Sequence, residues 1–203
     1  MKAVREAVEG SIRASIDILT LFAFSTENWQ RPASEISALM ALLEAYARKE
    51  KEELKRQGVE VRVLGELDRL APDTRRAIDG IMETTEGGEA LRLNLMISYS
   101  GREEILRAVR ALATEAAEGR RKPEEIDHKV FEKALFTGGI PDPDLLIRTS
   151  GELRISNFML WQLAYTEIHI TPVLWPDFTR QDLFAAVLDY QKRERRFGRV
   201  TAS

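Results

Sequence analysis

Hydrophobic positions follow two different periods along the chain, and these periods predict its elements. Apolar residues recur at every fourth position from Val4 to Ile16, which predicts an amphipathic helix over residues 2–16. Residues 18–24 (ILTLFAF) instead form a short, nearly continuous apolar run, as expected of a strand buried on both faces. A polar loop follows at residues 25–32.

Further helices and strands follow in alternation. Helical periodicity predicts helices at residues 34–57, 72–85, 102–118, 128–136 and 179–193, with Ser34 as the N-cap of the first. Strand patterns occur at residues 59–63, 91–97, 145–147 and 167–170, and a further apolar stretch covers 157–165. This order predicts an α/β fold with a mostly parallel central sheet and helices on both faces. Without repeats or low-complexity linkers, residues 1–203 are expected to form a single domain.

Composition narrows the chemistry that such a fold can carry. The 203 residues include no cysteine, which excludes disulfides, thiolate zinc sites and cysteine nucleophiles and is typical of a reducing cytoplasm. Two histidines are too few for a histidine-rich metal centre. A net charge of −3 argues against non-specific nucleic-acid binding, and no apolar run approaches the roughly 20 residues of a membrane helix. Carboxylates, amides, hydroxyls and arginines must therefore supply the chemistry.

Three predicted strands end in loops that carry polar side chains. In an open parallel sheet, ligands bind outside the carboxyl ends of the strands, so these loops are expected to share one rim. They contribute Ser25, Glu27, Asn28, Trp29 and Arg31, then Ser98, Ser100, Gly101 and Arg102, and finally Arg148, Ser150, Gly151, Arg154 and Ser156. Arginines, hydroxyls and glycine amides suit phosphate oxygens. The same arginines could equally pair with Asp142, Asp144 or Glu152, and spacing alone leaves both interpretations open.

Several common signatures are absent. The chain has no G-x-x-x-x-G-K-[ST] and no G-x-G-x-x-G, so the usual nucleotide-binding loops are missing. It also lacks G-x-S-x-G, which argues against an α/β-hydrolase, and the D-D-x-x-D of trans-type prenyl synthases.

Four segments instead resemble the cis-prenyltransferases. Residues 24–32 (FSTENWQRP) closely match that family's F-S-[ST]-E-N-W-x-R-P segment. Residues 142–152 (DPDLLIRTSGE), 154–158 (RISNF) and 174–178 (LWPDF) match further segments in the same order. The chain is therefore identified as a member of this family, of the undecaprenyl diphosphate synthase type.

The resemblance implies a reaction and the residues that perform it. The family condenses isopentenyl diphosphate repeatedly onto an allylic diphosphate, such as farnesyl diphosphate, with cis geometry, using Mg²⁺ and acting as a homodimer. By correspondence, isopentenyl diphosphate is expected on Arg148, Arg154, Ile155 and Ser156, and the remaining substrate site on Ser25, Thr26, Glu27, Trp29 and Arg31. Asn28 occupies the position assigned to proton uptake, which an amide can perform only through a water or a phosphate oxygen. Glu167 corresponds to a Mg²⁺ ligand, and Arg196 and Gly198 to a motif that reaches the partner subunit.

One predicted helix carries an unusually wide apolar face. Leu39 and Leu43 lie on this face, which could simply pack between the sheet and a neighbouring helix. The resemblance implies that it forms, with Leu93, the wall of a tunnel for the growing chain, because burying each CH₂ contributes about 0.8 kcal/mol. The product implied is the lipid carrier of cell-wall synthesis, delivered to the membrane by a cytoplasmic enzyme with a peripheral association with its inner face.

The chain departs from the family pattern in two places. The family's N-Y-G-G-R is Ser98-Tyr99-Ser100-Gly101-Arg102 here. An opening strand and a D-G-N-G-R-W loop, which supply an Mg²⁺-linked aspartate and the allylic diphosphate cradle, do not precede the predicted helix 2–16. Residues 1–203 are therefore expected to fold but to be nearly inactive. A non-catalytic dimer subunit and a generic phosphate-binding domain stay open as alternative functions.

Two aromatic residues, Trp29 and His169, also have structural interpretations. Trp29 could be a core plug beside its loop, although its place between Asn28 and Arg31 favours a site. His169 lies in a predicted strand and is interpreted as structural.

Overall fold

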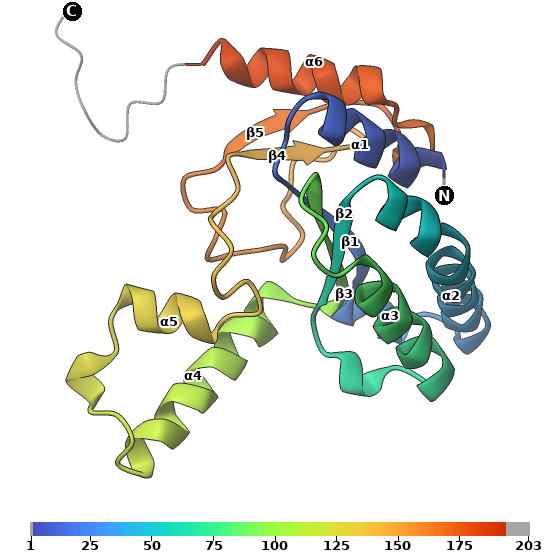
Figure 1. Cartoon of the computed structure of the whole chain (residues 1–203). Helices are drawn as coiled ribbons and strands as arrows, with labels where there is room; N and C mark the ends of the chain where they lie inside the picture. Colours follow the sequence, from blue (N-terminus) through green and yellow to red (C-terminus); the bar gives the residue numbers. More distant parts are fainter. Residues whose placement is uncertain (1, 194–203) are drawn as a thin grey trace, which may run out of the picture.

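The computed structural model describes residues 2–193, which form an α/β fold with two parallel sheets (Figure 1). In the first sheet, β1 (Ile18–Ser25), β3 (Leu91–Tyr99) and β2 (Val59–Leu64) lie in the order β1–β3–β2. In the second sheet, β4 (Leu145–Arg148) pairs with β5 (Glu167–Ile170). The predicted fold class is confirmed, and all five strands expected from the sequence are present.

The helices lie close to their predicted positions. They are α1 (Lys2–Arg13), α2 (Ala33–Arg56), α3 (Pro72–Thr85), α4 (Gly101–Ala117), α5 (His128–Ala134) and α6 (Arg180–Gln191). The prediction that Ser34 caps α2 is wrong: the first helical hydrogen bonds of α2 are accepted by the carbonyl of Pro32, so Pro32 is the N-cap residue. None of the helices in residues 2–193 is long and apolar enough to span a membrane.

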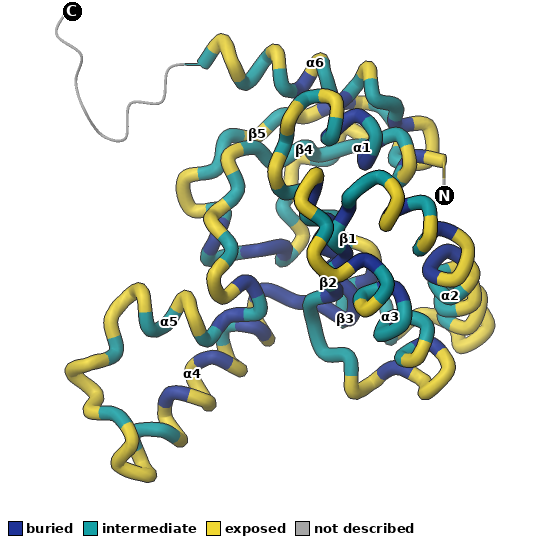
Figure 2. The backbone as a smooth tube through the Cα atoms, viewed as in Figure 1, coloured by how far each residue is buried: buried dark blue, intermediate teal, exposed yellow. Residues whose placement is uncertain are grey.

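The central strand β3 is packed on both faces. The face that carries Leu93 belongs to an apolar cluster with residues of α1, α2 and α3. The opposite face carries Met96, which packs against Phe158 and Met159 of the segment after β4. Around Met96 this irregular segment takes the place of the helix layer that the sequence predicted. Figure 2 shows the buried residues gathered at the sheet, while the α4–α5 hairpin projects with a largely exposed surface.

β1 differs from the prediction of a strand buried on both faces. Among the described strands it pairs with β3 alone, and most of its residues are only half buried. Leu21 nevertheless contacts one apolar cluster and Phe22 contacts the other. The apolar run therefore reflects two packed faces, and the partial exposure comes from the edge position, which a sequence pattern does not reveal.

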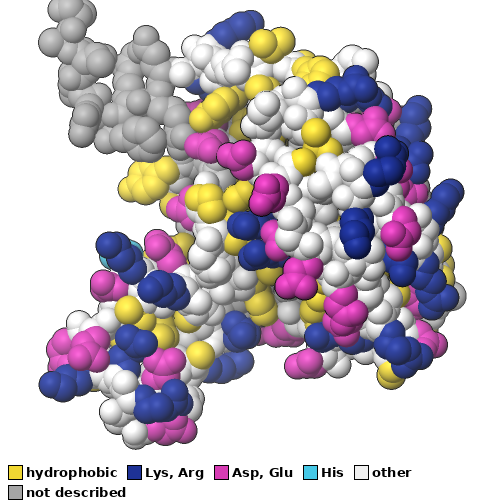
Figure 3. All heavy atoms as spheres, in the orientation of Figure 1, with side chains coloured by type: hydrophobic (Ala, Val, Ile, Leu, Met, Phe, Trp, Pro, Cys, Tyr) yellow, Lys and Arg dark blue, Asp and Glu magenta, His cyan; other side chains and the backbone are white. Residues whose placement is uncertain are grey.

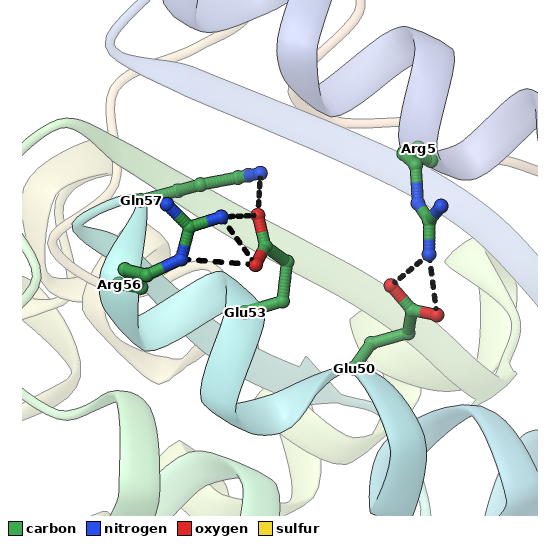
Figure 4. Close-up of polar contacts among 5 residues, drawn as sticks. All are labelled: Arg5, Glu50, Glu53, Arg56 and Gln57. Carbon is green, nitrogen blue, oxygen red and sulfur yellow. Dashed lines mark hydrogen bonds and ion pairs between the residues drawn. The ribbon is translucent and has the colours of Figure 1, made fainter.

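Ion pairs tie α1 to two other helices. Arg5 Nη2 donates hydrogen bonds of 2.9 Å to both carboxylate oxygens of Glu50 on α2 (Figure 4). Arg180, at the start of α6, contacts Glu6 at 2.7 Å and Glu9 at 2.8 Å. The hydrogen bonds from Arg180 lower the pKa of Glu6 to about 2. α1 thus links the layer of α2 and α3 to α6 and the second sheet.

We expect Arg180→Gln to destabilise the fold in a pH-dependent way. The pKa of Glu6 lies below its ordinary value of 4.5, so its pairing stabilises the fold above that pH, and this contribution is lost as the pH falls toward 2. Urea midpoints of the two proteins should differ most at neutral pH and converge on acidification. A difference that stays constant with pH would show that Arg180 acts through packing alone.

Candidate functional site

A pocket of about 550 Å³ lies at the carboxyl ends of β1 and β4, the rim expected from the sequence. Such a volume is typical of small-molecule sites. The walls are formed by Phe22, Ala23, Phe24, Ser25, Glu27, Asn28, Arg31, Arg148, Ser156 and Asn157. Two arginines, two hydroxyls and an apolar wall therefore face one space.

Arg148, the last residue of β4, brings a guanidinium group to the wall of this pocket. Its Nη2 donates to Ser156 Oγ at 3.4 Å, whereas its buried Nε has no hydrogen-bond partner among residues 2–193. A buried donor without a partner is costly, and such groups are usually satisfied by a ligand or an ordered water. Arg31 adds a second cation and forms an ion pair with Glu35 at 2.8 Å. This donor set suits an anion.

Glu27 brings a negative charge to the same pocket. Its Oε1 accepts a hydrogen bond of 2.8 Å from Asn157 Nδ2. Burial raises the pKa of Glu27, but the hydrogen bonds from Asn157, its own backbone, Ser25 and Thr26 outweigh this effect, so the pKa lies below its ordinary value. The carboxylate therefore stays ionised at neutral pH.

Asn28 is held by its own loop. Its Oδ1 accepts a hydrogen bond of 2.9 Å from the backbone N–H of Ser25, which closes the 3₁₀ turn of Thr26–Gln30. One lone pair of the Asn28 oxygen is engaged in this way, and Nδ2 is a donor that Asn28 can offer to a ligand in the pocket.

Trp29 packs behind the loop and does not line the pocket. Its ring meets Phe24 edge-on with centroids 5.1 Å apart, and its Nε1 donates to Ser98 Oγ at 2.9 Å. The guanidinium of Arg69 lies 5.0 Å from the centre of the ring. The structure therefore supports the packing interpretation of Trp29, with the side chain anchoring the loop.

Three other expected residues also lie outside the pocket walls. Arg154 forms an exposed ion pair with Glu152 at 2.5 Å, the pairing that the sequence left open. The carbonyl of Ile155 accepts a hydrogen bond from the N–H of Phe158, and Thr26 Oγ1 donates to Glu27 at 3.4 Å. The substrate roles of these residues stay predictions of the resemblance.

Asn157, which the sequence analysis did not select, lines the pocket between Ser156 and Glu27. It also accepts hydrogen bonds from the N–H groups of Gly101 and Arg102, with its carbonyl oxygen and Oδ1 respectively. The amide of Gly101, a glycine amide of the kind expected to suit a phosphate, is thus used within the protein. The feature of the sequence that could have pointed to Asn157 as a site residue was its position directly after Ser156 in the RISNF segment.

Glu167 does not join this pocket in the described structure. It begins β5, and Ile170 at the other end of that strand pairs with Arg148, so Glu167 and Arg148 lie at opposite ends of the sheet. Arg193 neutralises Glu167 at 2.8 Å. No three acidic, histidine or cysteine side chains within residues 2–193 form a metal-binding group. Glu167 is thus paired with Arg193 away from the pocket, and its role as a Mg²⁺ ligand stays a prediction of the resemblance. Arg196 and Gly198 lie outside the described part.

The expected tunnel residues share one apolar cluster. Leu93 is fully buried at the centre of β3, and Leu39 and Leu43 pack against the same cluster while partly exposed. Their contact agrees both with simple packing of the α2 face on the sheet and with a tunnel wall for the growing chain.

Fold and pocket together define an α/β protein with a pocket at the rim of its sheets, lined by two arginines that suit an anion. Residues 1–198 match the family described as "Putative undecaprenyl diphosphate synthase". The chain belongs to this family and is a prenyltransferase.

Relatives and solved structures show the same relationship. The isoprenyl transferase of Geobacter sulfurreducens is 48% identical over 202 residues, covering 100% of this chain and 82% of the relative. That of Heliobacterium mobile is 47% identical, covering 98% and 77%. Lavandulyl diphosphate synthase from Lavandula x intermedia, solved with dimethylallyl diphosphate, has a TM-score of 0.93 at 35% identity, covering 97% of this chain and 86% of that one. A "probable undecaprenyl diphosphate synthase" from Campylobacter jejuni reaches 0.86 at 34% identity, covering 98% and 91%.

Arg148→Ala is expected to weaken isopentenyl diphosphate binding by about 10- to 150-fold, the usual range for a lost hydrogen bond to a charged group. Calorimetric titration measures the change. Arg120→Ala, which removes an exposed arginine paired with Glu118, is the control and should bind as the wild type does. Equal affinity of both variants would remove Arg148 from the site.

Proposed function

We propose that the chain condenses isopentenyl diphosphate repeatedly onto an allylic diphosphate with cis geometry, to make the undecaprenyl carrier of cell-wall synthesis. The observation that carries the diphosphate assignment is the convergence of Arg148, Ser156 and Arg31 on the walls of one pocket, where Arg148 Nη2 contacts Ser156 Oγ at 3.4 Å. The dimethylallyl diphosphate bound by the lavandulyl diphosphate synthase supports an allylic diphosphate as the second substrate class.

The arrangement of the pocket suggests which residues bind the diphosphate, which contact the isopentenyl group and where the proton goes. Arg148 and Ser156 would hold diphosphate oxygens, and Phe22 and Phe24 offer the adjoining apolar wall to the isopentenyl group. Each condensation releases a proton. Asn28 is barely basic and its oxygen already accepts from Ser25, so we assign the proton to a diphosphate oxygen or a water held by Asn28 Nδ2.

The growing chain is proposed to lie along the first half of α2. The buried residues of α2 all lie in its second half, from Tyr46 to Leu54. Leu39 and Leu43, in the first half, stay partly exposed although they pack toward Leu93. Apolar surface left beside the cluster is what a hydrocarbon product needs. A product of this kind partitions into lipid, which supports delivery to the inner face of the cytoplasmic membrane.

Mg²⁺ dependence stays a proposal that rests on the resemblance alone. Mg²⁺ is usually bound by one or two carboxylates together with substrate phosphates, so the bound diphosphates would have to supply most of its ligands here. We therefore assign no step to the metal.

A homodimer is proposed through the apolar surface of β5 and its surroundings. Ile168 and Ile170 on β5 are 46% and 42% exposed, and Leu174 and Leu188 nearby are more exposed still. Figure 3 shows hydrophobic side chains at the surface in this region, above the projecting α4–α5 hairpin. Among the described strands β5 pairs with β4 alone, so it is also a sheet edge. An apolar sheet edge is covered in most soluble proteins, and a second copy would cover it symmetrically.

Ile168→Asp is expected to convert a dimer to a monomer, because it places a charge in the centre of that surface. Analytical ultracentrifugation gives the mass of each species. Leu42→Asp introduces the same charge at a residue of α2 that is 50% exposed, and should leave the dimer intact. A dimeric Ile168→Asp protein would locate the interface elsewhere.

The reaction itself is tested with labelled isopentenyl diphosphate, farnesyl diphosphate and Mg²⁺, with product length as the readout. In a form extended through the upstream reading frame, Leu93→Ala should change the product length by opening the apolar cluster, whereas Leu183→Ala, in a separate cluster beside α6, should leave the length unchanged. An unchanged distribution for Leu93→Ala would place this residue in the ordinary core.

Residues 1–203 and a form extended through the upstream reading frame are assayed together, because the resemblance expects the D-G-N-G-R-W loop before Met1. If neither form makes polyprenyl products, the phosphate-binding or non-catalytic interpretation would replace the proposal.

A further inference from the structure

Asn157 joins three loops around the pocket through four hydrogen bonds. Its Nδ2 donates to Glu27 Oε1 at 2.8 Å and to Ser100 Oγ at 2.7 Å. Its Oδ1 accepts from the N–H of Arg102 at 3.0 Å, and its carbonyl oxygen accepts from the N–H of Gly101 at 2.8 Å. Glu27 follows β1, residues 100–102 follow β3, and Asn157 itself lies in the segment after β4. One side chain therefore fixes three strand ends relative to one another.

The protein already uses the polar groups of this amide. Both Nδ2 hydrogens have protein acceptors, and Oδ1 has a protein donor. Asn157 lines the pocket, yet its side chain has no hydrogen left to donate to a diphosphate. The side chain can therefore influence a ligand through the residues that it holds.

The backbone at this position is also unusual. Asn157 has a φ of 60° and Ser156 a φ of 50°, so two consecutive residues adopt the left-handed conformation. Asparagine tolerates this conformation better than most residues, and strain of this kind tends to be kept at functional sites. The turn directs the Asn157 side chain toward Glu27 and Ser100 while Ser156 contacts Arg148.

We propose that Asn157 is a positioning residue for diphosphate binding, which holds Glu27 and the start of α4 in place beside Arg148 and Ser156. This inference rests on the proposed function of the pocket. Without the amide, the carboxylate of Glu27 is free to pair with Arg148 or Arg31, which line the same pocket, and it then competes with a diphosphate for these cations.

Three variants separate this role from a structural one. Asn157→Gly keeps access to the left-handed backbone and removes the amide, and we expect its diphosphate affinity to fall by about tenfold. Asn157→Asp tolerates the same backbone and can still accept from Arg102, but it sets a second carboxylate against Glu27. We expect it to bind more weakly than the glycine variant while unfolding at an equal or higher temperature. In the double variant N157D/E27Q the hydrogen bond re-forms with its direction reversed, and affinity should recover toward the wild-type value.

The readouts are calorimetric titration with inorganic diphosphate and with isopentenyl diphosphate, the thermal midpoint of each variant, and Arg148→Ala run in parallel. The inference is supported when the aspartate variant binds most weakly and the double variant recovers. It is overturned if both single variants bind as the wild type does while Arg148→Ala loses binding, a result that leaves the proposed function intact. The inference is also overturned if the variants rank in diphosphate affinity as they rank in thermal midpoint, because loss of stability would then explain the loss of binding. Wild-type binding by Arg148→Ala would overturn the proposed function, and this inference with it.

Discussion

The burial of β3 on both faces is the constraint on which the rest of the structure depends. A strand in this position can only be central, so β1 and β2 flank it in parallel and all three end at the same edge. The approach of the backbones there is very close. A Cβ on Gly65, just after β2, would lie 2.0 Å from the carbonyl oxygen of Ile97, so this position requires glycine. Close packing at the carboxyl edge thereby holds the ends of β2 and β3 together.

Side chains rather than a helix end provide the charge of the pocket. The N-terminus of α4 lies beside it, and free N–H groups at a helix N-terminus would ordinarily attract an anion. Here the N–H groups of Gly101 and Arg102 bind Asn157, and that of Glu103 binds Ser100 Oγ. The cations among the lining residues of the pocket are Arg148 and Arg31, and the carboxylates nearest to them in the described structure are held by Asn157, in the case of Glu27, and by Arg31 itself, in the case of Glu35.

The sequence predicts the helices and strands better than it predicts which of them lie next to one another. All five strands follow from periodicity, because apolar spacing is a local property of the chain. The edge position of β1 depends on strand order, which no local pattern contains. The same limit applies to the site. Residues 24–32 locate the loop correctly, yet within it Asn28 faces the pocket while Trp29, its neighbour, packs behind. Adjacent residues of a tight turn point in different directions. The contacts that hold Trp29 behind the loop include residues distant in sequence, Ser98 and Arg69, and no local pattern contains them.

The two halves of α2 have different roles: the second half anchors the helix, and the first half offers apolar surface to the proposed product. The second half is anchored by buried Tyr46, Ala47 and Leu54 and by the pairing of Glu50 with Arg5. The first half begins directly after the pocket loop and keeps apolar side chains partly exposed, with Leu42 at 50%. Full burial of this half would add stability at roughly 25 cal/mol per Å² but would leave no apolar surface for a hydrocarbon product. Because the second half already fixes the helix on the sheet, the first half can stay loosely packed without loss of the fold. A long helix that is held at one end and open at the other is therefore consistent with a site that must accept a product of increasing length.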